Sequence, residues 1–169
     1  MGDTADIVNA GVTVLHLVAN SAGTHNANSY ASGLPSGTEA HTLSGWQGPT
    51  TVKVTYAQNV GDEWYHFWNV TWDFDVMFDF MHHGRFHDKG LYVDQITPAI
   101  DVRHLPPDFT LSVTANFPHE GLNHGSDDDP LAALNFTMIV ELKGMLGQLV
   151  TSTRTFHCTA AGDGNWAMA

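Results

Sequence analysis

Aromatic and polar side chains alternate along one stretch of the chain, between Trp64 and Phe80. A period of two places odd-numbered and even-numbered side chains on opposite faces of a β-strand. The even-numbered positions are nearly all apolar, which predicts a face buried in the core. The odd-numbered positions combine rings with hydrogen-bond acceptors, a composition that suits sugar rings and their hydroxyl groups. This pattern predicts a surface for a glycan or lipid headgroup, made of Tyr65, Phe67, Asn69, Asp73 and Asp75.

Three carboxylates of this strand share its odd-numbered face: Asp73, Asp75 and Asp79. Neighbours at i and i+2 lie about 7 Å apart, so their charges repel unless a cation compensates them. A Ca²⁺ ion or a protonated histidine on a neighbouring strand would do so. Solvated surface carboxylates are the simpler interpretation, and the carboxylate pair of a glycoside hydrolase is a third. No glutamate lies in this row, which disfavours the hydrolase.

A histidine-rich segment follows, with the sequence His82-His83-Gly84-Arg85-Phe86-His87-Asp88. Imidazole and carboxylate groups are ligands of Zn²⁺ and other divalent ions. The spacing matches no specific zinc signature, and a polar loop is the alternative. The candidate metal ligands are His82, His83, His87 and Asp88.

An acidic run of Asp127, Asp128 and Asp129 is a candidate Ca²⁺ site. An EF-hand loop that starts at Asp127 needs glycine at its sixth position and glutamate at its twelfth. Ala132 and Met138 stand there, so the run predicts a loosely bound ion outside any EF-hand.

Sequence signatures of nucleotide binding and of serine hydrolases are absent. Cys158 is the only cysteine, which excludes an intramolecular disulfide and a multi-cysteine metal site. His157 would point to the opposite face of a strand and could not activate the Cys158 thiol. These features favour a protein that is not an enzyme.

The segment Trp64–Val70 resembles, with a one-residue gap, the Trp/Tyr-rich segment of actinoporin-like sandwich proteins. That group includes membrane-binding cytolysins and fungal fruit-body lectins. The resemblance covers seven residues, implies binding to a membrane or a glycan, and assigns a role to no single residue.

Alternating apolar and polar residues recur along the chain and predict strands to position these groups. We expect strands at residues 12–18, 50–56, 64–80, 91–95, 99–103, 109–116, 134–142 and 145–157. The longest of them should contain a bulge or a bend. Together they predict an all-β fold over residues 1–169: a single-domain antiparallel β-sandwich or jelly roll of about eight or nine strands, with a barrel as second choice. A long Gly/Ser/Asn-rich loop is expected at about 19–49, and an acidic loop at 121–130.

The charge of the chain limits the classes of partner that it can bind. Six Lys and Arg residues oppose 18 Asp and Glu, a formal net charge of −12, so clustered cations for nucleic acid are lacking. No run of 18 apolar residues predicts a transmembrane helix, and no basic region of a signal peptide is visible. The compartment stays open, with secretion and a virion surface both compatible. Protonation of all 11 histidines would bring the charge to about −1.

The sequence predicts one function first and leaves two others open. The first is a non-enzymatic β-sandwich that binds a glycan or lipid headgroup. The alternative is a structural subunit that assembles with copies of itself, as in a capsid, a fibre or a decoration protein. A metal-dependent or carboxylate-dependent hydrolase is the third.

Overall fold

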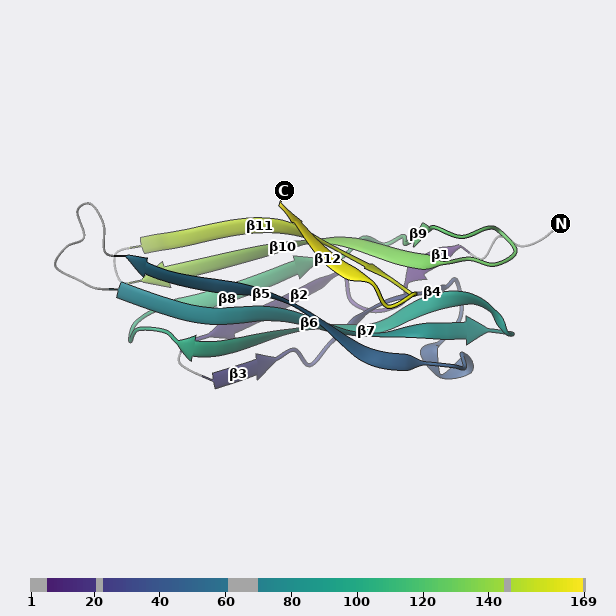
Figure 1. Cartoon of the computed structure of the whole chain (residues 1–169), viewed down its shortest axis with the longest axis horizontal. Helices are drawn as coiled ribbons and strands as arrows, with labels where there is room; N and C mark the ends of the chain where they lie inside the picture. The colour runs from purple at the N-terminus through teal and green to yellow at the C-terminus, as the bar shows by residue number, and fades with distance from the viewer. Residues whose placement is uncertain (1–5, 21–22, 61–69, 145–146, 169) are drawn as a thin grey trace.

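Two antiparallel β-sheets pack face to face in the computed structural model of the chain, which describes residues 6–20, 23–60, 70–144 and 147–168 (Figure 1). The strands are β1 (Ile7–Asn9), β2 (Val14–Ala19), β3 (Gly23–Asn26), β4 (Ala31–Pro35), β5 (Gln47–Val60), β6 (Val70–Phe86), β7 (Lys89–His104), β8 (Thr110–Asn116), β9 (Leu122–Asn123), β10 (Ala132–Gly144), β11 (Gly147–Thr159) and β12 (Gly164–Met168), with a 3-10 helix, η1, at Ala40–Thr42. Sheet 1 has the order β1-β4-β7-β6-β5, with β3 also paired to β7. Sheet 2 has the order β12-β11-β10-β8-β2, with β9 also paired to β10. The predicted all-β sandwich is confirmed, and the described strands form no closed barrel.

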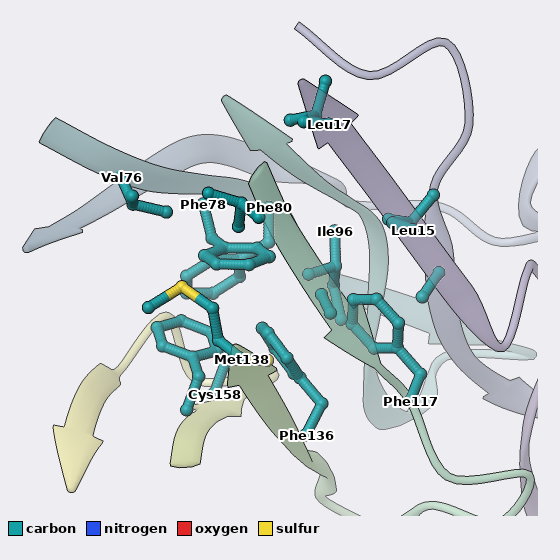
Figure 2. Packing of buried hydrophobic residues seen from close by; sticks show 14 of the residues in the cluster. Leu15, Leu17, Val76, Phe78, Phe80, Ile96, Phe117, Phe136, Met138 and Cys158 are labelled. Atoms are coloured by element: carbon teal, nitrogen blue, oxygen red, sulfur yellow. The ribbon is translucent and has the colours of Figure 1, made fainter. Parts of the chain in front are cut away.

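The core lies between the two sheets (Figure 2). The even-numbered face of β6 is buried as predicted, at Trp72, Phe74, Val76, Phe78 and Phe80. Phe136 and Phe156 approach from sheet 2, with ring centroids 4.7 and 5.3 Å from that of Phe78. Each such side chain contributes about 2 kcal/mol by burial, so the rings between the sheets are a main source of stability.

The strand expected at 64–80 has different bounds. Residues 64–69 lie outside the described part of the chain, and β6 continues beyond Phe80 to Phe86. Its pairing with β7 shifts register at four places. The expected bulges are therefore present, and they let β6 and β7 bend along their length (Figure 1).

The sequence suggested two strands on either side of Pro98, but β7 runs through this residue as one strand. The Pro98 carbonyl accepts a hydrogen bond of 3.2 Å from the Ala27 N–H, so the ring nitrogen faces the same side. On that side the neighbour of β7 changes from β4, last paired at Ile96, to β3, first paired at Ala99. The missing N–H falls at this change of partner, where a proline is tolerated.

The stretch at 19–49, predicted as a loop, contains β3, β4 and η1. Every residue of β4 is buried, because Gly33 faces Val93 and Leu134 of the core while Ser32 and Leu34 face the segment that carries η1. Short strands of small residues lack the apolar alternation that reveals a strand in sequence. Two further short strands, β9 and β12, raise the total to twelve over the described residues. No helix among those residues has the length and apolar character needed to span a membrane.

Candidate functional site

A cavity of about 640 Å³ lies beside β4, between the segment that carries η1 and the strands β6 and β7. Its apolar wall includes Leu34, Leu43 and Met81. Its polar and aromatic groups come from both sides: Tyr30, Ser32, Glu39, Trp46, Asp94 and Gln95. A concave apolar pocket with a few convergent polar groups is where a small ligand is expected to bind.

Asp94 is a buried carboxylate in this cavity, with 3% of its surface exposed. Its Oδ1 accepts a hydrogen bond of 2.5 Å from Ser32 Oγ, which is itself buried. Among the described residues, Ser32 is the one side chain that donates to this carboxylate. Since an ionised carboxylate accepts about four hydrogen bonds, Asp94 retains capacity for donors of a ligand.

A β-bulge turns Asp94 and Gln95 toward the cavity. Phe80 of β6 lies opposite two residues of β7, Gln95 and Ile96, and Ser32 of β4 lies opposite Asp94 and Gln95. Gln95 has a φ of 53°, in the left-handed region. Bulges change the direction in which side chains point. A non-glycine residue with a left-handed backbone is strained, so this conformation of Gln95 lowers the stability of the protein.

Two aromatic rings line the cavity. The Trp46 ring lies against Gly84, where a Cβ atom would stand 2.4 Å from the indole, and its Nε1 donates to the Ala40 carbonyl at 3.2 Å. Tyr30 is about half exposed. At the rim, Glu39 pairs with His41, both well exposed. Trp46 is thus held at both ends of its ring system, which suits a platform for a ligand.

No pattern in the sequence predicted this site. Tyr30 and Trp46 are the only large aromatic residues in the Gly/Ser/Asn-rich stretch, and Asp94 interrupts the apolar run from Leu91 to Ile96. These two signals lie some fifty residues apart in the sequence and meet only in the folded chain.

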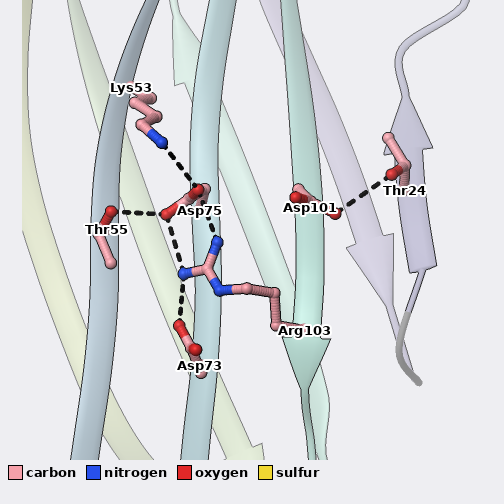
Figure 3. Close-up of polar contacts among 7 residues, drawn as sticks. All are labelled: Thr24, Lys53, Thr55, Asp73, Asp75, Asp101 and Arg103. Carbon is pink, nitrogen blue, oxygen red and sulfur yellow. Dashed lines mark hydrogen bonds and ion pairs between the residues drawn. The ribbon is translucent and has the colours of Figure 1, made fainter.

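The acidic surface predicted to bind a ligand carries an ion-pair network at Asp73 and Asp75 (Figure 3). Asp75 accepts from Arg103 Nη1 and Nη2, at 2.7 and 3.1 Å, and from Thr55 Oγ1 at 2.6 Å. Lys53 Nζ lies 3.5 Å from Asp75 Oδ2, and Arg103 also pairs with Asp73. Residues Tyr65, Phe67 and Asn69 of the same prediction lie outside the described residues.

Cations from both flanking strands therefore compensate Asp75, and Arg103 also compensates Asp73. The cross-strand histidine that the sequence predicted is present as well, because His104 of β7 pairs with Asp73 and, after the hydrogen bond from Arg103, its charge helps to lower the pKa of that carboxyl. Hydrogen bonds from Arg103 lower the pKa of Asp75 to about 2 and also lower that of Asp73, while they raise the pKa of Arg103. The third carboxylate, Asp79, accepts from Thr51 Oγ1 at 2.5 Å.

The structure brings two of the predicted zinc ligands together, His82 and His83, and places the other two beyond the end of β6. His82 is buried, with its Nε2 2.9 Å from Thr50 Oγ1 and its Nδ1 2.5 Å from His83 Nδ1. His87 and Asp88 form the two-residue turn between β6 and β7, with φ values of 50° and 61°. Four strand residues lie between His82 and that turn, which places His87 up to roughly 16 Å away. Within the described ranges, no three His, Cys, Asp or Glu side chains gather as a metal ligand set.

The predicted Ca²⁺ run has a structural role at one of its residues. Asp129 Oδ1 accepts a hydrogen bond of 2.9 Å from the Gly90 N–H, and the Asp129 N–H donates to Ser126 Oγ. Asp127 and Asp128 are exposed on the same loop. Asp129 thereby ties the loop to the start of β7.

Cys158 faces the core, as expected for a residue next to the partly exposed His157. Burial raises the pKa of its thiol to about 12. His157 points the other way, where its Nδ1 contacts Asn135 Oδ1 and its ring stacks on His124. The thiol is therefore a core group rather than a nucleophile.

No protein-family model matches the chain, and neither a curated protein nor a solved structure matches it.

Proposed function

We propose that this protein is a non-enzymatic glycan-binding β-sandwich whose site is the cavity between Trp46 and Asp94. The observation that carries the proposal is the buried Asp94 carboxylate at a wall of the cavity, held by Ser32 and still able to accept hydrogen bonds. Sugar hydroxyl groups are donors of that kind. The rings of Trp46 and Tyr30 supply apolar surfaces for the C–H faces of a sugar.

The charges of the cavity favour a neutral ligand over an anionic one. Glu39 and Asp94 are acidic, and none of the described lining residues is Lys or Arg. A phospholipid headgroup carries a phosphate, which needs a cation or several N–H donors. Of the two alternatives expected from the sequence, a glycan or a lipid headgroup, we therefore favour the glycan.

A glycan array followed by calorimetry with the best ligand tests the proposal. Asp94→Asn keeps the shape of the side chain and removes its charge, so affinity should fall roughly tenfold to a hundredfold. Trp46→Ala should weaken binding about tenfold through the lost platform. The matched control is Asp79→Asn, because Asp79 also accepts a hydroxyl hydrogen bond of 2.5 Å but does not line the cavity.

Several outcomes would overturn the proposal. They are an array without any bound glycan, binding that survives both cavity variants, and binding to phosphocholine vesicles in the absence of any glycan. Recovery of the ligand intact after incubation separates binding from hydrolysis by the carboxylates.

A further inference from the structure

The free edges of the two sheets differ in how they are protected. An unpaired strand edge invites pairing with another strand, and natural proteins block it with short strands, Lys, Pro, bulges or a covering segment. In sheet 1, β5 carries Pro49 and Lys53 and has a register shift near its start. The free side of β1 is covered by residues 119–121, which bond Ile7 and Asn9, and β3 is only four residues long.

Sheet 2 ends in β12 on one side and β2 on the other. β12 has only five residues, and its first residue, Gly164, packs with its face against the Val52 side chain of β5. By contrast, β2 pairs with β8 over six residues without a register shift, and no described strand pairs with its other side. It contains no Lys, Pro or acidic residue.

Two side chains of β2 that face solvent are also apolar. Val14 and Val18 are 54% and 45% exposed, and they are two of the four large apolar residues exposed among the described residues. His16 lies between them, with its Nδ1 2.9 Å from Thr114 Oγ1 of β8. In a chain with a net charge of −12, this uncharged strand is an edge at which a second copy meets little repulsion.

We propose that β2 is a self-association edge, at which two copies pair antiparallel about a two-fold axis beside His16. This register places Val14 of each copy opposite Val18 of the other, and His16 opposite His16, so one strand supplies both halves of the contact. The free main-chain N–H and C=O groups of β2 gain partners, and the two copies of sheet 2 become one continuous sheet. The inference does not depend on the ligand cavity.

The first test is the mass of the protein by light scattering behind size exclusion, over a wide range of protein concentration. We expect twice the 18.4 kDa of one chain at high concentration and a single chain on dilution. Val18→Lys places a charge at the edge and should leave a monomer at every concentration. Leu122→Lys is the matched control, because Leu122 is equally exposed but lies on β9, and it should keep the dimer.

The second test is a cross-link at the two-fold axis, and it also covers the case in which Val18→Lys is poorly folded. Facing residues of antiparallel strands have Cα atoms about 4.5–5.5 Å apart, which is within the range of a disulfide. His16→Cys should therefore form a covalent dimer on mild oxidation, and His41→Cys, at an exposed position on η1, should not. A single-chain mass at all concentrations, a dimer unaffected by Val18→Lys, a particle larger than a dimer, or equal cross-linking of the two cysteine variants would each overturn the inference.

Discussion

Arg103 of β7 holds the Asp75 carboxylate of β6 with both terminal nitrogens, Nη1 at 2.7 Å from Oδ2 and Nη2 at 3.1 Å from Oδ1. A paired guanidinium and carboxylate form two parallel hydrogen bonds with defined geometry. Asp75 is 3% exposed, so its charge is screened little by water. This contact links the two central strands of sheet 1 on the face away from the core (Figure 3).

Loss of the Asp75 charge should destabilise the protein. We expect Asp75→Asn to lower the free energy of unfolding by about 2 kcal/mol, because Arg103 and Lys53 lose a charged acceptor. Urea unfolding followed by circular dichroism measures this change. Asp73→Asn should cost less, since Asp73 is half-buried and contacts only Arg103 of the two cations. An equal cost for the two variants would show that burial of Asp75 does not matter.

The same ion pair predicts how stability falls in acid. The folded-state pKa of Asp75, about 2, lies below its ordinary value of 3.8, so the folded protein binds this proton less readily than the unfolded chain. The contribution of Asp75 is therefore complete above pH ~4 and is lost as the pH falls toward 2. The difference in unfolding free energy between wild type and Asp75→Asn should shrink over this window. A difference that stays constant down to pH ~2 would contradict the assignment.

His82 predicts a second loss of stability, at milder pH. Burial and then the charge of His83 lower the pKa of His82 below its ordinary value of 6.5. The folded state thus disfavours protonation, and stability should decrease as the pH falls below about 6.5. His82→Gln keeps a polar contact for Thr50 and should flatten the pH dependence between neutral and mildly acidic pH. Thermal melts over this range measure the effect, and the exposed His41→Gln is the control that should leave the profile unchanged.

Replacement of Gln95 by glycine should have opposite effects on the stability of the protein and on its affinity for a glycan. Its left-handed backbone costs a non-glycine residue about 1 kcal/mol, and glycine adopts the same conformation freely. Gln95→Gly should therefore raise stability by up to about 1 kcal/mol and weaken glycan binding roughly threefold to tenfold through the lost amide. Thr153→Gly, on the exposed side of β11, should lower stability instead. If Gln95→Gly lowers the free energy of unfolding as Thr153→Gly does, the left-handed backbone of Gln95 is not strained.

Sequence-based prediction did not reveal which residues lie close together in the folded chain. Alternation showed that Asp73 and Asp75 share one face of β6, but it gave no sign of their ion pairs with Arg103, which lies about thirty residues further along the chain. Six cations among 169 residues offered no reason to place one beside Asp75. The histidines were grouped by their nearness in sequence, whereas an extended strand carries His87 far from His82.

The sequence by itself determined the class of fold and the side of β6 that is buried, because a period of two between Trp72 and Phe80 has one physical solution, a strand with an apolar face. It also determined that Cys158 and His157 point apart. Only the tertiary structure decided which strands are neighbours. The cavity depends on that choice, since Ser32, Trp46 and Asp94 come from separate segments, and a bulge against β4 and β6 aims Asp94 and Gln95 at the same space. Alternation along one strand carries no information about its partners, so a site built across strands is invisible until the sheet is assembled.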